Sequence, residues 1–211
     1  VGGDCGAPTD VNIKCMHGAA QTKVCTYPTM FRVDGTPPKC IENLALLGYK
    51  RRELILYCSL IGPLKLSLNL QHLVNDSLLT LNLVGPSSSG DTPRISMERA
   101  AALVNERPGM AFGCVTIAER HLTKGTEHLN LLRKAGYGAK WFISQAVYDA
   151  EATIKLLHDY AGECRRRGCT PVKILLTFAP VGRPKTLQFV KWLGVHVPSA
   201  VEERILAKVR S

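Results

Sequence analysis

The sequence predicts an α/β protein of the (β/α)8 TIM-type barrel class. Two observations support this prediction: short apolar runs recur along the chain, and longer helical patterns fill the gaps between them. Continuous apolar runs are typical of strands that are covered on both faces, as in a parallel sheet. Because no Gly-rich dinucleotide fingerprint follows any of the runs, a Rossmann-type sheet is the second choice.

Five apolar runs are predicted as strands, and a weaker sixth follows them. They are RELILYCSL (52–60), LLTLNLVG (78–85), MAFGCVTI (110–117), WFISQAVY (141–148) and VKILLTFAP (172–180), with LGVHVP (193–198) as the weaker one. A closed barrel of this class needs eight strands. The barrel is therefore predicted to be incomplete at its N-terminal strands, which are missing, diverged or not in this chain.

Residues that favour the start of a helix occur between the predicted strands. Ser96 precedes MERAAALVNE, Thr126 precedes EHLNLLRKAG, and Asp149 precedes AEATIKLLHDYAGECRRR, so each is predicted as an N-cap. A last helical pattern is TLQFVKWLG. We expect two regions: an irregular Cys-, Pro- and Gly-rich extension at 1–50, with one short strand at Lys23–Tyr27, and barrel units at 51–211.

The chain carries a net charge of +10, from 27 Lys and Arg against 17 Asp and Glu. This balance fits contact with phosphates, nucleic acid or a larger acidic assembly, but says nothing about fold. The densest clusters of basic residues, at 50–52 and 165–167, are interpreted as solvated loop ends. A surface that binds a partner is the second interpretation. No apolar run reaches the roughly 18 residues that span a bilayer, and VGGDCGAPTD shows no signal-peptide pattern.

The eight cysteines are scattered and form no CxxC pair. A zinc site is therefore not predicted, and we expect no metal. Cys58 and Cys114 lie in apolar runs and are expected in the core. The simplest interpretation is a reduced, intracellular chain, in the cytoplasm or the mitochondrial matrix.

Polar residues at the predicted strand ends mark the candidate site, because a (β/α) barrel places its chemistry there. Glu119, Arg120 and His121 follow the third strand, and Gln145 and Tyr148 end the fourth. The loop GPSSSGDTPR (85–94) can cradle a phosphate, although an ordinary Gly/Ser loop is favoured. Gln145 is either a core amide bonded to the backbone or an amide that reads a planar heterocycle.

Residues 78–206 resemble the methylenetetrahydrofolate reductase family of flavin-containing (β/α)8 barrels. The stretch that carries the resemblance is FGCVTIAERHLTKGTEHLNLLRKAGYGAKWFISQAVYD (112–149). It keeps the family's order of a Glu-x-His segment, an acidic residue, a Lys, a Gly-Ala pair and a strand-end Gln. A later segment, LLTFAPVGRPKTLQFVKWLGVHVP, is similar to the family's seventh strand, helix and eighth strand.

The resemblance implies a role for each matching residue. Gly85, His121, Glu127 and Lys134 would contact a flavin, FAD or FMN, through its phosphate and ribityl chain; the family often has Asp at the Glu127 position. Gln145 would hydrogen-bond the pterin ring of folate, and Tyr148 would lie near it. NAD(P)H would be the electron donor.

The sequence departs from the family at two places, and two hypotheses about function therefore stay open. Val84-Gly85-Pro86 stands where the family carries Arg-Gly-Asp, and the general-acid Glu of its first strand has no equivalent, so no catalytic residue is assigned. One hypothesis is an oxidoreductase of one-carbon metabolism that passes a hydride through flavin to 5,10-methylenetetrahydrofolate. The alternative is a catalytically degenerate barrel that serves as a structural subunit, in a homo-oligomer or a larger mitochondrial or ribonucleoprotein assembly.

Overall fold

The computed structural model describes residues 24–26, 54–60, 80–85, 95–192 and 194–210. These belong to two compact units. Unit 1 comprises Val1–Val115 with Gly136–Lys140, and unit 2 comprises Thr116–Ala135 with Trp141–Ser211. The expected loop at 85–94 and most of the segment 1–50 lie outside the described residues.

Unit 1 is built on parallel strands that pair in the order of the sequence. β1 (Val24–Thr26) pairs with β2 (Leu54–Ser59), β2 with β3 (Thr80–Val84), and β3 with β4 (Ala111–Thr116). Each strand falls within a segment that the sequence predicted, β1 within Lys23–Tyr27. Sequential order without reversal is typical of a (β/α) barrel, whereas a doubly wound sheet reverses its order. The predicted class, α/β with a parallel sheet, is confirmed.

Among the residues of unit 1 that the structure describes, one helix packs against the strands. α4 (Met97–Asn105) begins where predicted, because the Ser96 hydroxyl accepts a hydrogen bond from the backbone N–H of Arg99 at 3.1 Å. Its buried Ala100, Ala101 and Val104 are at most 1% exposed. The Met97 sulfur lies 3.8 Å from the thiol of Cys114, which places α4 against the Cys114 face of β4. Cys114 is buried there, as predicted.

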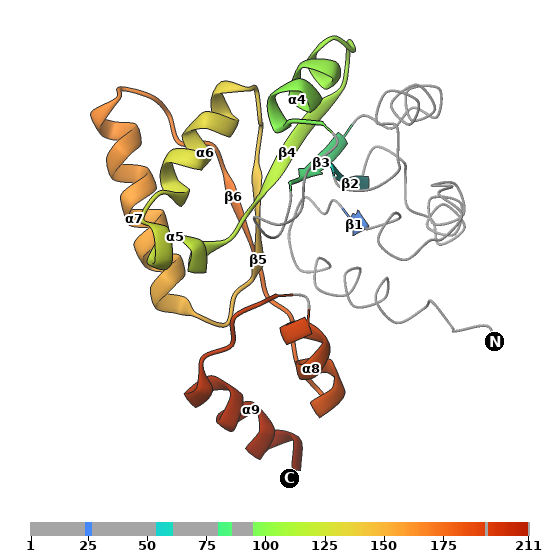
Figure 1. Cartoon of the computed structure of the whole chain (residues 1–211), viewed down its shortest axis with the longest axis vertical. Coiled ribbons are helices and arrows are strands. Elements are labelled where there is room, and N and C mark those ends of the chain that lie inside the picture. Colours follow the sequence, from blue (N-terminus) through green and yellow to red (C-terminus); the bar gives the residue numbers. More distant parts are fainter. Residues whose placement is uncertain (1–23, 27–53, 61–79, 86–94, 193, 211) are drawn as a thin grey trace, which may run out of the picture. The chain divides into compact units, whose positions relative to one another are not determined.

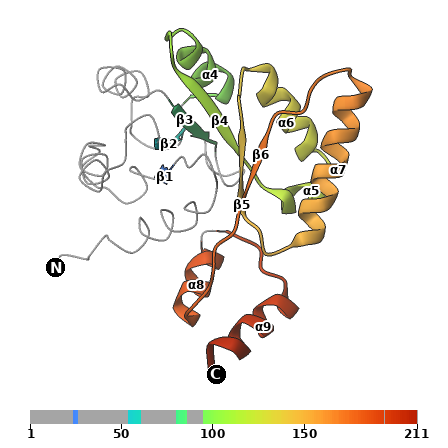
Figure 2. The same cartoon turned by 180° about the vertical axis from the view of Figure 1, so that it is seen from behind.

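Unit 2 alternates helices with two further strands, as Figures 1 and 2 show. Its elements are α5 (Ala118–Lys124), α6 (Glu127–Gly136), β5 (Phe142–Ala146), α7 (Ala150–Arg166), β6 (Ile174–Thr177), α8 (Pro184–Trp192) and α9 (Ser199–Arg210). β5 and β6 pair in parallel. In both views α5, α6 and α7 lie on one side of these strands. No helix in the described ranges is both long and apolar enough to cross a membrane.

The predicted cap and charge pattern of α7 is present. Asp149 caps it through Oδ1, which accepts from the backbone N–H of Ala152 at 3.0 Å. At the other end, Arg166 and Arg167 both pair with Glu163, which lies three and four positions before them in the sequence. Two of the three arginines in this cluster are therefore committed to a carboxylate of their own element.

The weaker strand predicted at LGVHVP is wrong. Residues 195–198 form no strand, and the chain enters α9 directly afterwards. Val195 and Val197 are each 7% exposed and pack with Leu187 and Val190 of α8, while His196 between them is exposed. The alternating pattern thus buries one side of an extended segment against a helix, which needs no neighbouring strand.

The ion pairs of Glu163 generate a pH-dependent contribution to stability. Arg166 and Arg167 lower the pKa of Glu163 to about 2 from 4.5. A carboxylate whose folded pKa is depressed stabilises the fold above its unfolded pKa, and this contribution is lost as pH falls through the folded value. We expect the melting temperature of Glu163→Gln to fall less than that of the wild type between pH 4.5 and pH 2, measured by circular dichroism. Parallel curves for the two proteins would contradict this.

Candidate functional site

The predicted site residues divide between the two units. Gly85 follows β3 in unit 1, and His121, Glu127, Lys134, Gln145 and Tyr148 belong to unit 2. Gly85 lies beside α4: a Cβ added to it would meet the Met97 methyl carbon at 3.6 Å, an ordinary contact. The site in unit 2 is built from the segments that follow β4, β5 and β6, where barrel proteins bind ligands.

His121 connects α5 to α7. Its side chain is 1% exposed, and Nε2 lies 2.8 Å from Oδ2 of Asp159. Hydrogen bonds from Lys155, His121 and His158 hold the pKa of Asp159 well below its usual range, so this carboxylate only accepts. The Nε2 atom of His121 must therefore carry the hydrogen in this contact.

A second histidine lies against the first. The rings of His121 and His128 meet edge to face, with centroids 4.9 Å apart. The Nδ1 atoms of both are buried and have no hydrogen-bond partner among the residues that the structure describes. No group of three metal-ligating side chains gathers within the described ranges.

Glu127 joins the end of β4 to the start of α6. It is 3% exposed, and Oε1 accepts from the Thr116 hydroxyl at 3.2 Å and from the Ile117 backbone N–H at 3.4 Å. Oε2 accepts from the Asn130 amide at 3.1 Å. Both oxygens of the carboxylate are therefore engaged within the chain, at a helix start where negative charge is favourable.

Lys134 lies in the last turn of α6 and is half-buried. Glu127 and Lys134 are two helical turns apart, so they share a face but are separated by roughly 10 Å along the axis. A ligand that contacts both would have to extend along α6. Their assignment to a flavin stays a prediction.

Gln145 lies at an irregularity in β5. Ile143 pairs with Leu175 and Ala146 with Thr177, so β5 has one more residue than β6 between these pairs. Such a bulge re-aims side chains, and bulges are over-represented next to active sites. Thr177 compensates for the lost pairing: its backbone N–H donates to the Ser144 hydroxyl at 2.9 Å, and its own hydroxyl donates to the Ser144 carbonyl at 2.8 Å. Gln145, half-buried, is the polar residue that this bulge presents near the carboxyl end of β5.

Tyr148 follows the same strand and points toward the C-terminal helices. Its hydroxyl donates to the backbone carbonyl of Ala179 at 2.6 Å. Its ring packs against the cluster formed by Leu187, Val190, Val195 and Val197. Tyr148 thereby ties the end of β5 to the segment after β6, and its assigned contact with folate stays a prediction.

Glu119 is a titratable group at the start of α5. It is half-buried, and this burial raises its pKa above the ordinary value. Its own backbone hydrogen bond lowers the pKa, the neighbouring Asp149 raises it, and His196 lowers it. Glu119 therefore lies among charged groups from the segments after β5 and before α9.

Asn82 in unit 1 is a residue that the sequence analysis missed. It is 0% exposed in the middle of β3, and neither amide atom has a hydrogen-bond partner among the described residues. Leaving a buried polar group without a partner costs about 1–3 kcal/mol. The signal was available, since LLTLNLVG contains a single polar amide in an apolar run, as WFISQAVY does with Gln145.

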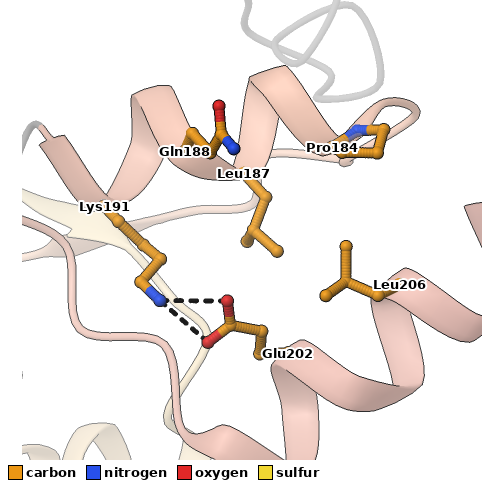
Figure 3. Close-up of a pocket in the computed structure, with 6 residues that line it drawn as sticks. All are labelled: Pro184, Leu187, Gln188, Lys191, Glu202 and Leu206. Carbon is orange, nitrogen blue, oxygen red and sulfur yellow. Dashed lines mark hydrogen bonds and ion pairs between the residues drawn. The ribbon is translucent and has the colours of Figure 1, made fainter.

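A groove lies between α8 and α9 (Figure 3). It has a volume of about 370 Å³. Pro184, Leu187, Gln188, Lys191, Glu202 and Leu206 line it. The ammonium of Lys191 lies 2.9 Å from each carboxylate oxygen of Glu202. Because these charges compensate each other, the groove offers little attraction to an anionic ligand.

Comparison with known proteins supports the fold. No protein-family model matches the chain, and no curated protein matches it. Among solved structures, it is similar to an uncharacterized protein from Clostridium thermocellum that binds two copies of 5-methyl-5,6,7,8-tetrahydrofolic acid. The two are 23% identical, the match covers 87% of this chain and 74% of the other, and the TM-score is 0.60. Likeness at this identity shows the fold alone.

Two enzymes of known structure are more distant. A 4-hydroxy-2-oxoglutarate aldolase/2-deydro-3-deoxyphosphogluconate aldolase is 17% identical, with a TM-score of 0.33 over 72% of this chain and 60% of its own. A 2,3-dimethylmalate lyase of the PEP mutase/isocitrate lyase superfamily is 13% identical, with a TM-score of 0.39 over 74% and 65%. These likenesses are too slight to bear on function.

The contacts of Glu127 predict a structural effect of its removal. Glu127→Ala leaves the Thr116 hydroxyl and the Ile117 N–H without their acceptor, so we expect a loss of about 2–3 kcal/mol in the free energy of unfolding. Glu127→Gln keeps one acceptor oxygen and serves as the control, with a loss of about 1 kcal/mol. Urea denaturation measures both. Unchanged stability in Glu127→Ala would show that the carboxylate does not hold β4 to α6.

Proposed function

We propose that this chain is a folate-binding (β/α) domain whose ligand is a reduced folate such as methyltetrahydrofolate. The observation that carries the proposal is the amide of Gln145, which a bulge presents near the carboxyl end of β5. A primary amide offers a donor and an acceptor, which matches the alternating donors and acceptors on the edge of a pterin ring. The fold likeness to a protein that binds methyltetrahydrofolate supports the same ligand class.

The electrostatics of the chain are consistent with this ligand. Folates carry carboxylates on their glutamate tail, and a net charge of +10 favours the approach of an anion. Within unit 2, Glu119 supplies a carboxyl group of raised pKa beside Asp149 and His196. The carboxylate of Glu119 can accept a hydrogen bond from an N–H group of the ring.

The oxidoreductase hypothesis is the more specific form of this proposal. It needs a flavin, which would carry a hydride from NAD(P)H to the folate. Two side chains assigned to that flavin have polar atoms engaged within the chain, since His121 Nε2 bonds Asp159 and both Glu127 oxygens have donors. These residues do not fit a flavin phosphate as they are placed. The proposed function therefore stops at folate binding, and no hydride-transfer step is derived.

The structural-subunit alternative has one observation in its favour. Trp192 is 73% exposed and stacks on Phe189, which is 37% exposed, with ring centroids 5.8 Å apart. Aromatic side chains are enriched at protein interfaces. A chain that binds no folate but associates through this pair would support the assembly role.

Substitution of Gln145 tests the proposed ligand contact. We expect Gln145→Ala to raise the Kd for 5-methyltetrahydrofolate about tenfold, because one or two hydrogen bonds to the pterin ring are lost. Isothermal titration calorimetry on the whole chain measures the change. Gln188→Ala, a truncation of the exposed glutamine on α8, is the matched control and should leave the Kd unchanged. Equal Kd values for Gln145→Ala and the wild type would remove the main support for the proposal.

A flavin titration separates folate binding from the oxidoreductase hypothesis. We expect the Kd for 5-methyltetrahydrofolate to be the same with and without added FAD or FMN, because two of the side chains assigned to the flavin, His121 and Glu127, are already bonded within the chain. Visible absorbance after desalting measures flavin uptake. Retention of one flavin per chain, with a tighter folate Kd, would instead favour the oxidoreductase.

A further inference from the structure

The turn that ends α7 brings two cysteines together. Gly168 has a φ of 65°, in the left-handed region that favours glycine, and its backbone N–H donates to the carbonyl of Arg165 at 3.1 Å. The next N–H, of Cys169, donates to the carbonyl of Cys164 at 3.0 Å. In helix ends closed by this pair of hydrogen bonds, the side chains at the first and last positions of the turn commonly pack together. In this chain both positions are cysteines.

The distance between the two cysteines suits a disulfide. The covalent bonds and the 3.0 Å hydrogen bond keep the Cα atoms of Cys164 and Cys169 within roughly 7 Å of each other. Disulfides usually join Cα atoms about 4.4–6.8 Å apart. The side chains also interact directly: burial is the main cause that raises the pKa of Cys164, and the hydrogen bond and charge of the Cys169 thiol raise it further. A bond between the two sulfur atoms therefore needs little movement of the backbone.

The segment that carries Cys169 is also held to α7 on its other side. Tyr160 lies one turn before Cys164, and its hydroxyl accepts from the backbone N–H of Val172 at 2.9 Å. The Tyr160 ring meets Phe142 of β5 edge to face, with centroids 6.3 Å apart. Cys169 is thus fixed by one contact with α7 before it and another after it, so its thiol stays near Cys164.

The two thiols differ in their access to solvent. Cys164 is 1% exposed, whereas Cys169 is exposed. A dissolved oxidant can therefore reach Cys169 and not Cys164. Residues 163–167 hold three arginines and one glutamate, so their net charge is +2, which favours the approach of an anionic reagent. An accessible thiol beside a second thiol that can displace a bound group is the arrangement found in redox-sensitive cysteine pairs.

We propose that Cys164 and Cys169 are a reversible thiol–disulfide pair, oxidised by an anionic disulfide of low molecular weight. Cys169 is the thiol that reacts first, and Cys164 is the thiol that completes the bond. The bond fastens the end of α7 to the segment that leads into β6.

The oxidation proceeds in two exchange steps. The Cys169 thiolate attacks one sulfur of the small disulfide, which forms a mixed disulfide and releases one small thiolate. Cys164 then gives its proton to water, and its sulfur attacks Sγ of Cys169. The Cys164–Cys169 bond forms and the second small thiolate leaves. The cysteine pair loses two electrons and the small disulfide gains them, so two small thiols are produced.

Peptide mapping of the whole chain tests the pair. The protein is equilibrated with glutathione and glutathione disulfide, free thiols are blocked with N-ethylmaleimide, and trypsin is added. Because trypsin cleaves after each of the arginines at 165–167, Cys164 and Cys169 fall into separate peptides, 156–165 and 168–173. We expect mass spectrometry to find these two peptides joined, and dithiothreitol to separate them.

The same equilibrium measures what the fold contributes. We expect the disulfide to be at least about tenfold more stable against glutathione in the folded chain than in urea. The reason is that the turn holds the two thiols in contact, whereas the ends of an unfolded segment meet only part of the time.

Substitutions assign the order of reaction. In Cys164→Ser, Cys169 has no second thiol beside it, and we expect it to retain one glutathione as a mixed disulfide. In Cys169→Ser, we expect Cys164 to react at least about tenfold more slowly than Cys169 does in Cys164→Ser, because it is buried. Cys114→Ala removes another buried thiol and is the matched control, which should leave the amount of joined peptides unchanged.

Three results would overturn the proposal. The first is a wild type in which Cys169 carries glutathione while Cys164 stays reduced. The second is a bond from either residue to another cysteine of the chain. The third is a disulfide that is no more stable in the folded chain than in urea. If Cys164→Ser does not fold, the peptides of the wild type and of Cys169→Ser decide. None of these measurements involves folate, so their outcome is independent of the proposed function.

Discussion

Parallel pairing of the strands is the constraint on which the rest of this protein depends. Because β5 and β6 run in the same direction, both end at the same edge of unit 2, and the segments that follow them meet there. The extra residue in β5 would leave backbone groups without partners, and the hydroxyls of Ser144 and Thr177 bond them instead. This local repair lets β5 hold a polar residue, Gln145, next to the strand end without breaking the pairing.

The polar residues of the candidate site divide by whether the fold itself uses them. His121 and Glu127 are both nearly inaccessible and both bonded to other elements, His121 to Asp159 of α7 and Glu127 to the end of β4. These contacts fasten α5 and α6 to their surroundings, so their chemistry is already committed. The contacts that His121 and Glu127 make within the chain therefore account for these residues without a ligand.

Two other polar residues, Asn82 and Glu119, differ from these in their effect on the stability of the fold. Asn82 is buried in a strand, and its amide has no hydrogen-bond partner among the described residues, which costs about 1–3 kcal/mol per group. The half-buried Glu119 keeps a raised pKa because water is partly excluded. Neither arrangement improves folding. Binding sites commonly hold such groups, because a ligand that supplies the missing partner gains what the fold has lost.

The sequence by itself determined the class of fold, the positions of β1 to β6 within a few residues, and the caps at Ser96 and Asp149, because these depend on neighbours close along the chain. It also marked Gln145 as an unusual residue. Only the tertiary structure decided that residues 195–198 pack on α8 instead of forming a strand, that β5 carries a bulge, and that His121 and Glu127 bond within the chain. Strand pairing and side-chain partners join residues far apart in sequence, so no local pattern can specify them.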